Sequence, residues 1–344
     1  MTIPILREDA GKPVLEVRDL SIILLTETAM VGAVSAVNYA VYPGQTLAVV
    51  GESGSGKTVM NLAPLGLLPA GVSVDVQGSV TVADKELVGA SAATLMAVRG
   101  REIGVVFQDP LSALNPNRRI GGQIEEILTL RLGQTAYAAR ARAVELLGLV
   151  GIPEPERRLR LFPHEMSGGM RQRVMIAIAL AGEPRVLIAD EPTTALDVTI
   201  QAQILQLLKS LQASLGMAMV IVTHDIGVVA NVADHVAVMY AGKIVEYGEV
   251  GQVLMQARHP YTRALLDSVP PPDAPVGSRF NGLVGAPPDL SKPRVGCAFA
   301  ARCPIVEARC HLTPPPLVPM GAQTAACWVT NSAVYGEAFT NAAS

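Results

Sequence analysis

The sequence predicts an α/β fold with a buried parallel β-sheet, a helical subdomain and an irregular C-terminal extension. The segments TLAVV (Thr46–Val50) and VLIAD (Val186–Asp190) are almost entirely apolar, which is typical of strands covered on both faces. The stretch from about 111 to 181 is helical in pattern, and YAARARAVELLGL at 137–149 is its clearest periodic segment. From Val269 onward the composition turns proline-rich, which predicts irregular structure.

Length and charge narrow the class of protein. A chain of 344 residues can hold one large domain with an addition, or two domains. The formal net charge is −3, so charge gives no support for nonspecific nucleic-acid binding. No internal repeat is visible, and we therefore expect the chain to contain one copy of its main functional domain.

The run from Thr28 to Gly51 raises the question of a membrane span, because it contains no charged residue and the mean hydropathy of the chain is +0.36. Pro43 and Gly44 divide this run with a turn, and each half is valine-rich and as long as one strand. We therefore expect two buried strands rather than a spanning helix. The first residues carry charges where a secretory signal needs an apolar core, so we expect a cytosolic protein.

A phosphate-binding loop directly follows the strand at Thr46–Val50. The sequence GESGSGKT matches G-x-x-x-x-G-K-[ST] between a strand and an apolar segment that can begin as a helix. Its glycines let backbone N–H groups turn toward a phosphate, the lysine can neutralise the β- and γ-phosphates of a nucleotide, and the threonine hydroxyl can bind Mg²⁺. The loop alone does not separate kinases, GTPases and ATPases. The alternative is a glycine-rich turn that matches by chance. The residues of the predicted loop are Gly51, Glu52, Ser53, Gly54, Ser55, Gly56, Lys57 and Thr58.

Four further motifs follow in the chain. Gln108 ends the apolar segment VVFQ, MSGGM at 166–170 begins a helical segment, Asp190 and Glu191 end a buried strand, and His224 ends MVIVTH. Taken singly, each has an ordinary interpretation: a loop glutamine, a helix cap, two acids at a strand end and a structural histidine.

In this order the motifs resemble those of the ATP-binding subunits of ABC transporters, from Gly51 to His224. The resemblance implies a P-loop NTPase fold of the ABC ATPase type, with a RecA-like core, an antiparallel β subdomain and a helical subdomain. It implies a nucleotide-binding domain at 13–262, with the helical subdomain at about 111–181. The rest of the chain, 263–344, would be a C-terminal extension.

The resemblance also implies roles for single residues. Gln108 would contact the metal and the attacking water, and Asp190 would hold Mg²⁺ through water together with Thr58. Glu191 would be the general base, and His224 would hold the γ-phosphate and the water against it.

One part of the expected site would come from another subunit. The MSGGM segment differs from the family's LSGGQ at its first and last positions, where both residues are methionine. Its central residues would reach across a dimer to the γ-phosphate, and Asp197 would lie along the dimer interface. Hydrolysis should therefore require a second ATPase subunit, a sibling in preference to another copy. The central residues are Ser167, Gly168 and Gly169.

One feature common in this family is missing. Members often stack an aromatic side chain on adenine from the loop upstream of the P-loop, yet Glu27 to Asn38 contains no Phe, Tyr or Trp. We expect Met30 or Val31 to serve as a weaker apolar substitute.

All four cysteines lie close to the C-terminal end of the chain, at Cys297, Cys303, Cys310 and Cys327. Disulfides fit poorly with a cytosolic enzyme, and zinc sites more often contain C-x₂-C pairs. The spacing alone leaves disulfides, zinc, an iron–sulfur cluster and free thiols open.

HPYTRALL at 259–266 and the triplet Arg302-Cys303-Pro304 resemble the oligopeptide, dipeptide and nickel importers. Some members of that branch carry a [4Fe-4S] cluster on these cysteines. The resemblance therefore implies a [4Fe-4S] cluster, with Zn²⁺ as the alternative, that staples the extension.

The function implied is the ATPase subunit of a bacterial importer of dipeptides or oligopeptides, at the cytoplasmic face of the inner membrane. Its partners would be the second ATPase subunit, two permease subunits and an extracytoplasmic solute-binding protein, without nucleic acid. The alternatives are import of nickel, glutathione or an opine-like solute, and a soluble ABC ATPase of DNA repair or translation.

Overall fold

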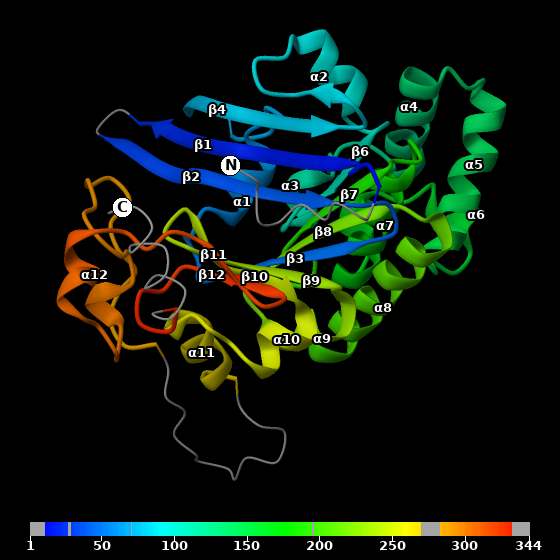
Figure 1. Cartoon of the computed structure of the whole chain (residues 1–344). Coiled ribbons are helices and arrows are strands. Elements are labelled where there is room, and N and C mark those ends of the chain that lie inside the picture. Colours follow the sequence, from blue (N-terminus) through cyan, green and yellow to red (C-terminus); the bar gives the residue numbers. More distant parts are fainter. Residues whose placement is uncertain (1–10, 27–28, 70, 195, 270–282, 332–344) are drawn as a thin grey trace.

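The computed structural model describes residues 11–26, 29–69, 71–194, 196–269 and 283–331 (Figure 1). Its centre is a large mixed β-sheet with the strand order β11-β12-β10-β9-β3-β8-β7-β6. The five strands from β9 to β6 in this order are parallel, and the others are antiparallel. The strands are β6 (Ile103–Val106), β7 (Val186–Asp190), β8 (Ala218–Thr223), β3 (Thr46–Val50), β9 (His235–Tyr240), β10 (Lys243–Glu249), β12 (Gln323–Ala325) and β11 (Val318–Met320).

The parallel strands are apolar because both faces of the sheet are covered. Along β8, Met219 and Ile221 pack into a core formed with helices, whereas Val220 and Val222 pack into a second core with a smaller sheet. Parallel strands also bring their carboxyl ends to one edge. The P-loop, Gln108, Glu191 and His224 follow β3, β6, β7 and β8, so this edge gathers the motifs.

The smaller sheet is antiparallel and has the order β2-β1-β4-β5. Figure 1 shows β1, β2 and β4 on one side of the larger sheet. The two predicted strands of the uncharged run are confirmed as β2 and β3, joined by a turn at Pro43 and Gly44. Among the described residues, no helix has the length and apolar character needed to cross a membrane. The strands are β1 (Leu15–Leu25), β2 (Met30–Val41), β4 (Ser73–Val82) and β5 (Lys85–Glu86).

The predicted helical stretch consists of helices that share one apolar core. The periodic segment at 137–149 is confirmed within α5, which Thr135 caps by accepting a hydrogen bond from the Ala138 N–H. Ile124 and Leu128 of α4 and Leu146 of α5 belong to this core. The helices are α3 (Pro110–Ala113), α4 (Ile120–Leu132), α5 (Ala136–Leu149), α6 (Pro155–Arg158), η1 (Pro163–Glu165) and α7 (Gly168–Leu180).

The remaining helices flank the sheets. Leu208 of α8, Val229 of α9 and Tyr261 of α11 pack into the same core as α4 and α5. α1 and α2 contribute Met60 and Val98 to the core of the smaller sheet. The helices are α1 (Lys57–Leu62), α2 (Ala92–Val98), α8 (Val198–Leu215), α9 (Ile226–Val232), α10 (Val250–Met255) and α11 (Pro260–Asp267).

The extension is more regular than its composition predicts. Its strand β12 pairs with β10, and β11 pairs with β12, so the extension adds two strands to the main sheet. It also contains η2 (Ala300–Arg302) and α12 (Ala308–Leu312). The domain boundaries 13–262 and 263–344 stay predictions, although the sheet itself continues across them.

Candidate nucleotide-binding site

The P-loop backbone adopts conformations that require glycine. Gly51 and Gly56 have φ angles of 154° and 101°. A Cβ atom on Gly51 would lie 2.1 Å from the carbonyl oxygen of Met239, and one on Gly56 would lie 2.3 Å from that of Ala33. The loop is therefore pressed between β9 and β2, and any side chain at these two positions would displace it.

Lys57 lies buried inside the loop. Its Nζ atom donates hydrogen bonds to the carbonyl oxygens of Gly51 (2.7 Å) and Glu52 (2.9 Å). Burial lowers the pKa of Lys57, and the nearby carboxylates of Glu191, Asp190 and Glu52 oppose this shift. The ammonium group is therefore held by loop carbonyls, from which the phosphates of a nucleotide could recruit it.

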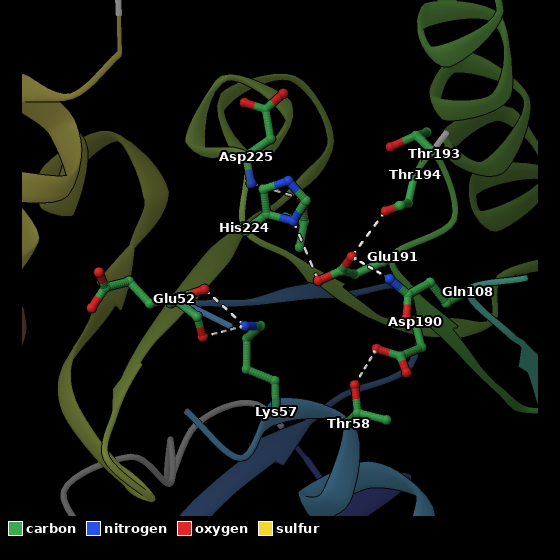
Figure 2. A network of polar contacts seen from close by, with 12 residues as sticks. Glu52, Lys57, Thr58, Gln108, Asp190, Glu191, Thr193, Thr194, His224 and Asp225 are labelled. Atoms are coloured by element: carbon green, nitrogen blue, oxygen red, sulfur yellow. Dashed lines mark hydrogen bonds and ion pairs between the residues drawn. The ribbon is translucent and has the colours of Figure 1, made fainter. Parts of the chain in front are cut away.

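Thr58 and Asp190 form a pair of oxygen ligands beside the loop. The Thr58 hydroxyl donates a hydrogen bond of 3.0 Å to Oδ1 of Asp190 (Figure 2). Asp190 ends β7 and is buried, and this burial raises its pKa. A hydroxyl and a carboxylate at this distance are the hard oxygen donors that Mg²⁺ prefers, so the residues present fit this ion.

Glu191 is the centre of a second polar network (Figure 2). Its Oε2 atom accepts hydrogen bonds from Nε2 of Gln108 and from the hydroxyl of Thr194, both at 2.9 Å. Its Oε1 atom lies 3.3 Å from Nδ1 of His224. Glu191 has a φ angle of 45°, which is strained for a residue with a side chain and is typical of functional sites. The structure thus brings Gln108, Glu191 and His224 together, as the sequence predicts.

The MSGGM segment lies apart from this network. Ser167 caps α7 by accepting a hydrogen bond of 3.3 Å from the Met170 N–H, and its side chain is exposed. Within the described residues, no hydrogen bond or ion pair joins Ser167, Gly168 or Gly169 to the P-loop. Asp197 similarly caps α8 and is exposed. Ser167 and Asp197 are thus exposed on the surface of the chain, whereas Gly168 and Gly169 are half-buried.

The four cysteines meet at one small cavity of the extension, beside Phe299 and Trp328. The backbone N–H of Cys297 donates a hydrogen bond of 2.7 Å to the carbonyl oxygen of Cys310. Burial raises the pKa of Cys297 to about 11 and also raises that of Cys303. In the described part of the chain, no three or more His, Cys, Asp or Glu side chains are arranged to hold a metal ion. The thiols therefore share one cavity without forming a metal site as they stand, and the expected [4Fe-4S] or Zn²⁺ site stays a prediction.

The adenine contact expected at Met30 or Val31 stays a prediction. Met30 begins β2, is exposed and lines a cavity of about 790 Å³ between β2, β10 and the extension. Glu27 and Thr28 of the upstream loop lie outside the described residues.

Three residues of the site were not singled out from the sequence. Thr194 holds Glu191, while Tyr261 and Arg302 both bind the P-loop residue Glu52. Tyr261 belongs to HPYTRALL and Arg302 to the Arg-Cys-Pro triplet. Both signals were present in the sequence, but nothing in either segment shows that it reaches the P-loop.

Comparison with known proteins agrees with this geometry. Residues 34–194 match the family described as "ABC transporter", and residues 245–310 match "Oligopeptide/dipeptide transporter, C-terminal region". The oligopeptide transport ATP-binding protein OppD of Bacillus subtilis is 52% identical, over 84% of this chain and 80% of its own length. The dipeptide transport ATP-binding protein DppD of Bacillus subtilis is 45% identical, over 92% of this chain and 94% of its own length.

Solved structures of ABC transporter cassettes are also similar to this chain in fold. A bacterial ABC transporter cassette solved as a dimer has a TM-score of 0.60 and 29% identity, covering 69% of this chain and 98% of its own. CbiO1 from Clostridium perfringens has a TM-score of 0.60 and 28% identity, covering 72% of this chain and 92% of its own. This chain therefore belongs to the ATP-hydrolysing, ATP-binding subunits of ABC transporters, in the branch that carries the oligopeptide/dipeptide transporter C-terminal region.

Proposed function

We propose that this chain hydrolyses ATP to power the import of dipeptides or oligopeptides through a membrane transporter. The observation that carries the ATPase part is the position of Glu191, which Gln108, Thr194 and His224 hold at the edge of the sheet that also carries the P-loop. The peptide cargo is supported by the match of residues 245–310 and by the names of the relatives.

In the proposed reaction the P-loop amides bind the phosphates of ATP, and Lys57 moves from the Gly51 and Glu52 carbonyls to the β- and γ-phosphates. Thr58 and Asp190 would hold Mg²⁺, and the bound ion would offset the negative charge of the phosphates.

Glu191 accepts a proton from the attacking water. Gln108 and His224 hold both oxygen atoms of Glu191 and thereby fix its direction. Phosphoryl transfer needs little covalent assistance, so this positioning and the surrounding charge supply most of the catalysis.

The proposed site is completed by a second ATPase subunit, a sibling in preference to another copy. What supports this is the outward exposure of Ser167 and Asp197, together with the dimeric state of the related cassette. Two permease subunits and an extracytoplasmic solute-binding protein complete the proposed assembly, which places this chain at the cytoplasmic face of the inner membrane.

The cargo is tested in the assembled transporter, reconstituted in lipid vesicles with its permeases and binding protein. We expect dipeptides or oligopeptides to stimulate ATP hydrolysis and to accumulate in an ATP-dependent manner. Stimulation by nickel or glutathione, with no response to peptides, would show that the ATPase assignment holds and the cargo is wrong.

We also propose that the cysteine cavity holds a [4Fe-4S] cluster, with Zn²⁺ as the alternative. The support is that four thiols line one cavity, and the proposal requires them to turn toward a common centre. Iron, sulfide and zinc analysis of anaerobically purified protein tests it. Colourless protein with one zinc per chain would select zinc, and protein free of both metals would contradict the proposal.

A further inference from the structure

An ion pair between Arg302 and Glu52 joins the extension to the P-loop. Two N–H groups of the Arg302 guanidinium donate to the two carboxylate oxygens of Glu52, at 2.6 and 2.9 Å. This two-point geometry is the strongest form of the arginine–carboxylate contact. The Arg302 side chain is 5% exposed and that of Glu52 is 25% exposed, so water screens the pair only weakly.

Arg302 is held from several sides at once. Its Nε atom donates to the carbonyl oxygen of Val284, and Nη1 lies 3.3 Å from the hydroxyl of Tyr240. Its guanidinium carbon lies 5.9 Å from the ring centres of both Tyr240 and Phe299. These contacts therefore hold the guanidinium in place independently of Glu52.

Glu52 is fixed through its backbone as well. Its N–H donates a hydrogen bond of 2.7 Å to the hydroxyl of Tyr261, a fully buried residue of α11. Its carbonyl oxygen accepts the hydrogen bond from Lys57. Glu52 therefore links three parts of the molecule: the lysine that serves the phosphates, helix α11 and the extension.

The same arginine belongs to the cysteine segment. It ends η2 and directly precedes Cys303, and the Ala300 N–H at the start of η2 donates to the carbonyl oxygen of Cys297. Phe299, which packs against Arg302, also lines the cysteine cavity. Phe299 and η2 therefore connect the guanidinium of Arg302 to the cysteine cavity.

We propose that Arg302 is a positioning residue, which holds Glu52 in place so that the P-loop is preorganised for ATP. Through Arg302, the cysteine segment supports nucleotide binding. The proposal depends on ATP binding and not on the identity of the cargo. Arg302 acts through Glu52 and is not placed in contact with ATP.

Electrostatics alone predicts a different result from this proposal, and the difference gives a sharp test. If Glu52 acted only as a negative charge near the phosphates, its replacement by glutamine would tighten ATP binding. If Glu52 must be held by Arg302, Glu52→Gln weakens ATP binding, because the two-point contact is lost although a negative charge has been removed.

The experiment measures the affinity of the full chain for a fluorescent ATP analogue, and the kcat of the assembled transporter at saturating ATP. We expect Arg302→Gln and Glu52→Gln each to raise Kd about tenfold, as for the loss of one charged hydrogen bond, with kcat changed less than about twofold. Arg302→Lys retains the charge without the two-point contact and should fall between Arg302→Gln and the parent. Arg157→Gln, which removes an exposed arginine paired with Glu154, is the matched control and should leave Kd unchanged.

An unchanged Kd in Arg302→Gln would overturn the proposal, and so would an unchanged or lowered Kd in Glu52→Gln. If Arg302→Gln fails to fold, Glu52→Gln still decides, since it leaves the extension untouched. If the ATP affinity and the kcat of Arg302→Gln both fell in proportion to a lowered Tm, the role of Arg302 would be purely structural. This result would also count against the proposal.

The cysteine part has a separate test. Cys303→Ser should raise Kd in the parent chain and have no further effect in the Arg302→Gln chain, because both changes act on one contact. Additive effects of the two changes would mean that the segment does not act through Arg302.

Discussion

Gln108 donates a hydrogen bond of 2.9 Å from Nε2 to Oε2 of Glu191, which joins the residues that follow two neighbouring strands, β6 and β7. Helix α3 begins at Pro110, two positions after Gln108, and it leads into the helical stretch. A movement of these helices would therefore reach the carboxylate of Glu191 through a single contact.

Glu191→Gln should retain ATP binding and lose hydrolysis. The amide cannot accept a proton from water, and removing a general base typically lowers turnover about 10²- to 10⁴-fold. Lys57 and Thr58 remain unchanged, so the Kd for ATP should stay near that of the parent chain. Phosphate release and nucleotide binding by the same preparation measure both effects.

The matched control is Glu183→Gln, which removes an exposed carboxylate paired with Arg142. This variant should hydrolyse ATP normally. Turnover close to the parent rate in Glu191→Gln would remove Glu191 from the role of general base.

Ser167→Asp tests the contribution of a second subunit. Aspartate caps helices as well as serine does, so α7 should keep its structure, while a new negative charge would face the γ-phosphate bound by the partner. We expect ATP hydrolysis by the assembled complex to fall about tenfold or more, as two like charges meet. ATP binding by the separate subunit should not change.

Ser91→Asp is the corresponding control, because Ser91 caps α2 by accepting from the Thr94 N–H. It should hydrolyse ATP at the parent rate. Equal activity of the Ser167 and Ser91 variants would place the N-terminus of α7 outside the active dimer.

Asp190→Asn should stabilise the protein and abolish hydrolysis. Burial raises the pKa of Asp190, so its ionised form is disfavoured in the folded state, and the stability linked to this group is lost as pH rises through its folded pKa. Asparagine avoids that loss at neutral pH and still accepts from the Thr58 hydroxyl.

Thermal unfolding should therefore show a Tm raised by a few degrees at pH 7.5 for Asp190→Asn. The difference should shrink as pH falls and should vanish well below about 3.9, where the carboxyl is protonated in both the folded and the unfolded state. Asp75→Asn, at an exposed position, should leave Tm unchanged. A lower Tm for Asp190→Asn at pH 7.5 would contradict this account.

Glu246 anchors the start of α11 and should be needed for stability. It is fully buried, and its carboxylate accepts from the N–H groups of Arg258 (2.6 Å) and His259 (2.9 Å). Glu246→Ala leaves both donors unpaired, which should lower the free energy of unfolding by about 3 kcal/mol. Glu246→Gln retains an acceptor and should lose clearly less in urea-induced unfolding; equal losses would show that packing, not these hydrogen bonds, sets the cost.

The parts that could be predicted from the sequence are those encoded over a few adjacent positions. The apolar strands β3, β7 and β8 are recognisable because burial on both faces demands apolar residues throughout, and each motif stands where its strand ends. The turn between β9 and β10 is likewise local, since Ala241 and Gly242 both take positive φ angles.

The parts that could not be predicted depend on distant contacts. Arg302 and Glu52 are 250 positions apart, and no sequence pattern around either residue indicates that the two side chains form a contact. Strand β12 has only three residues, too few for an alternation of apolar and polar positions to show. The φ angle of 45° at Glu191 also has no signal in the sequence, because glutamate seldom adopts this conformation.

The pairing of β12 with β10 has a consequence for biosynthesis. During translation, residues 243–249 leave the ribosome well before residues 323–325 exist, so the β10 edge of the growing sheet stays unpaired for that interval. The sheet can be completed only after almost the whole described chain has emerged. While a ribosome is stalled within the proline-rich segment, the attached nascent chain would therefore present an unpaired β10 edge, and a chaperone that covers this edge would protect the nascent subunit from aggregation.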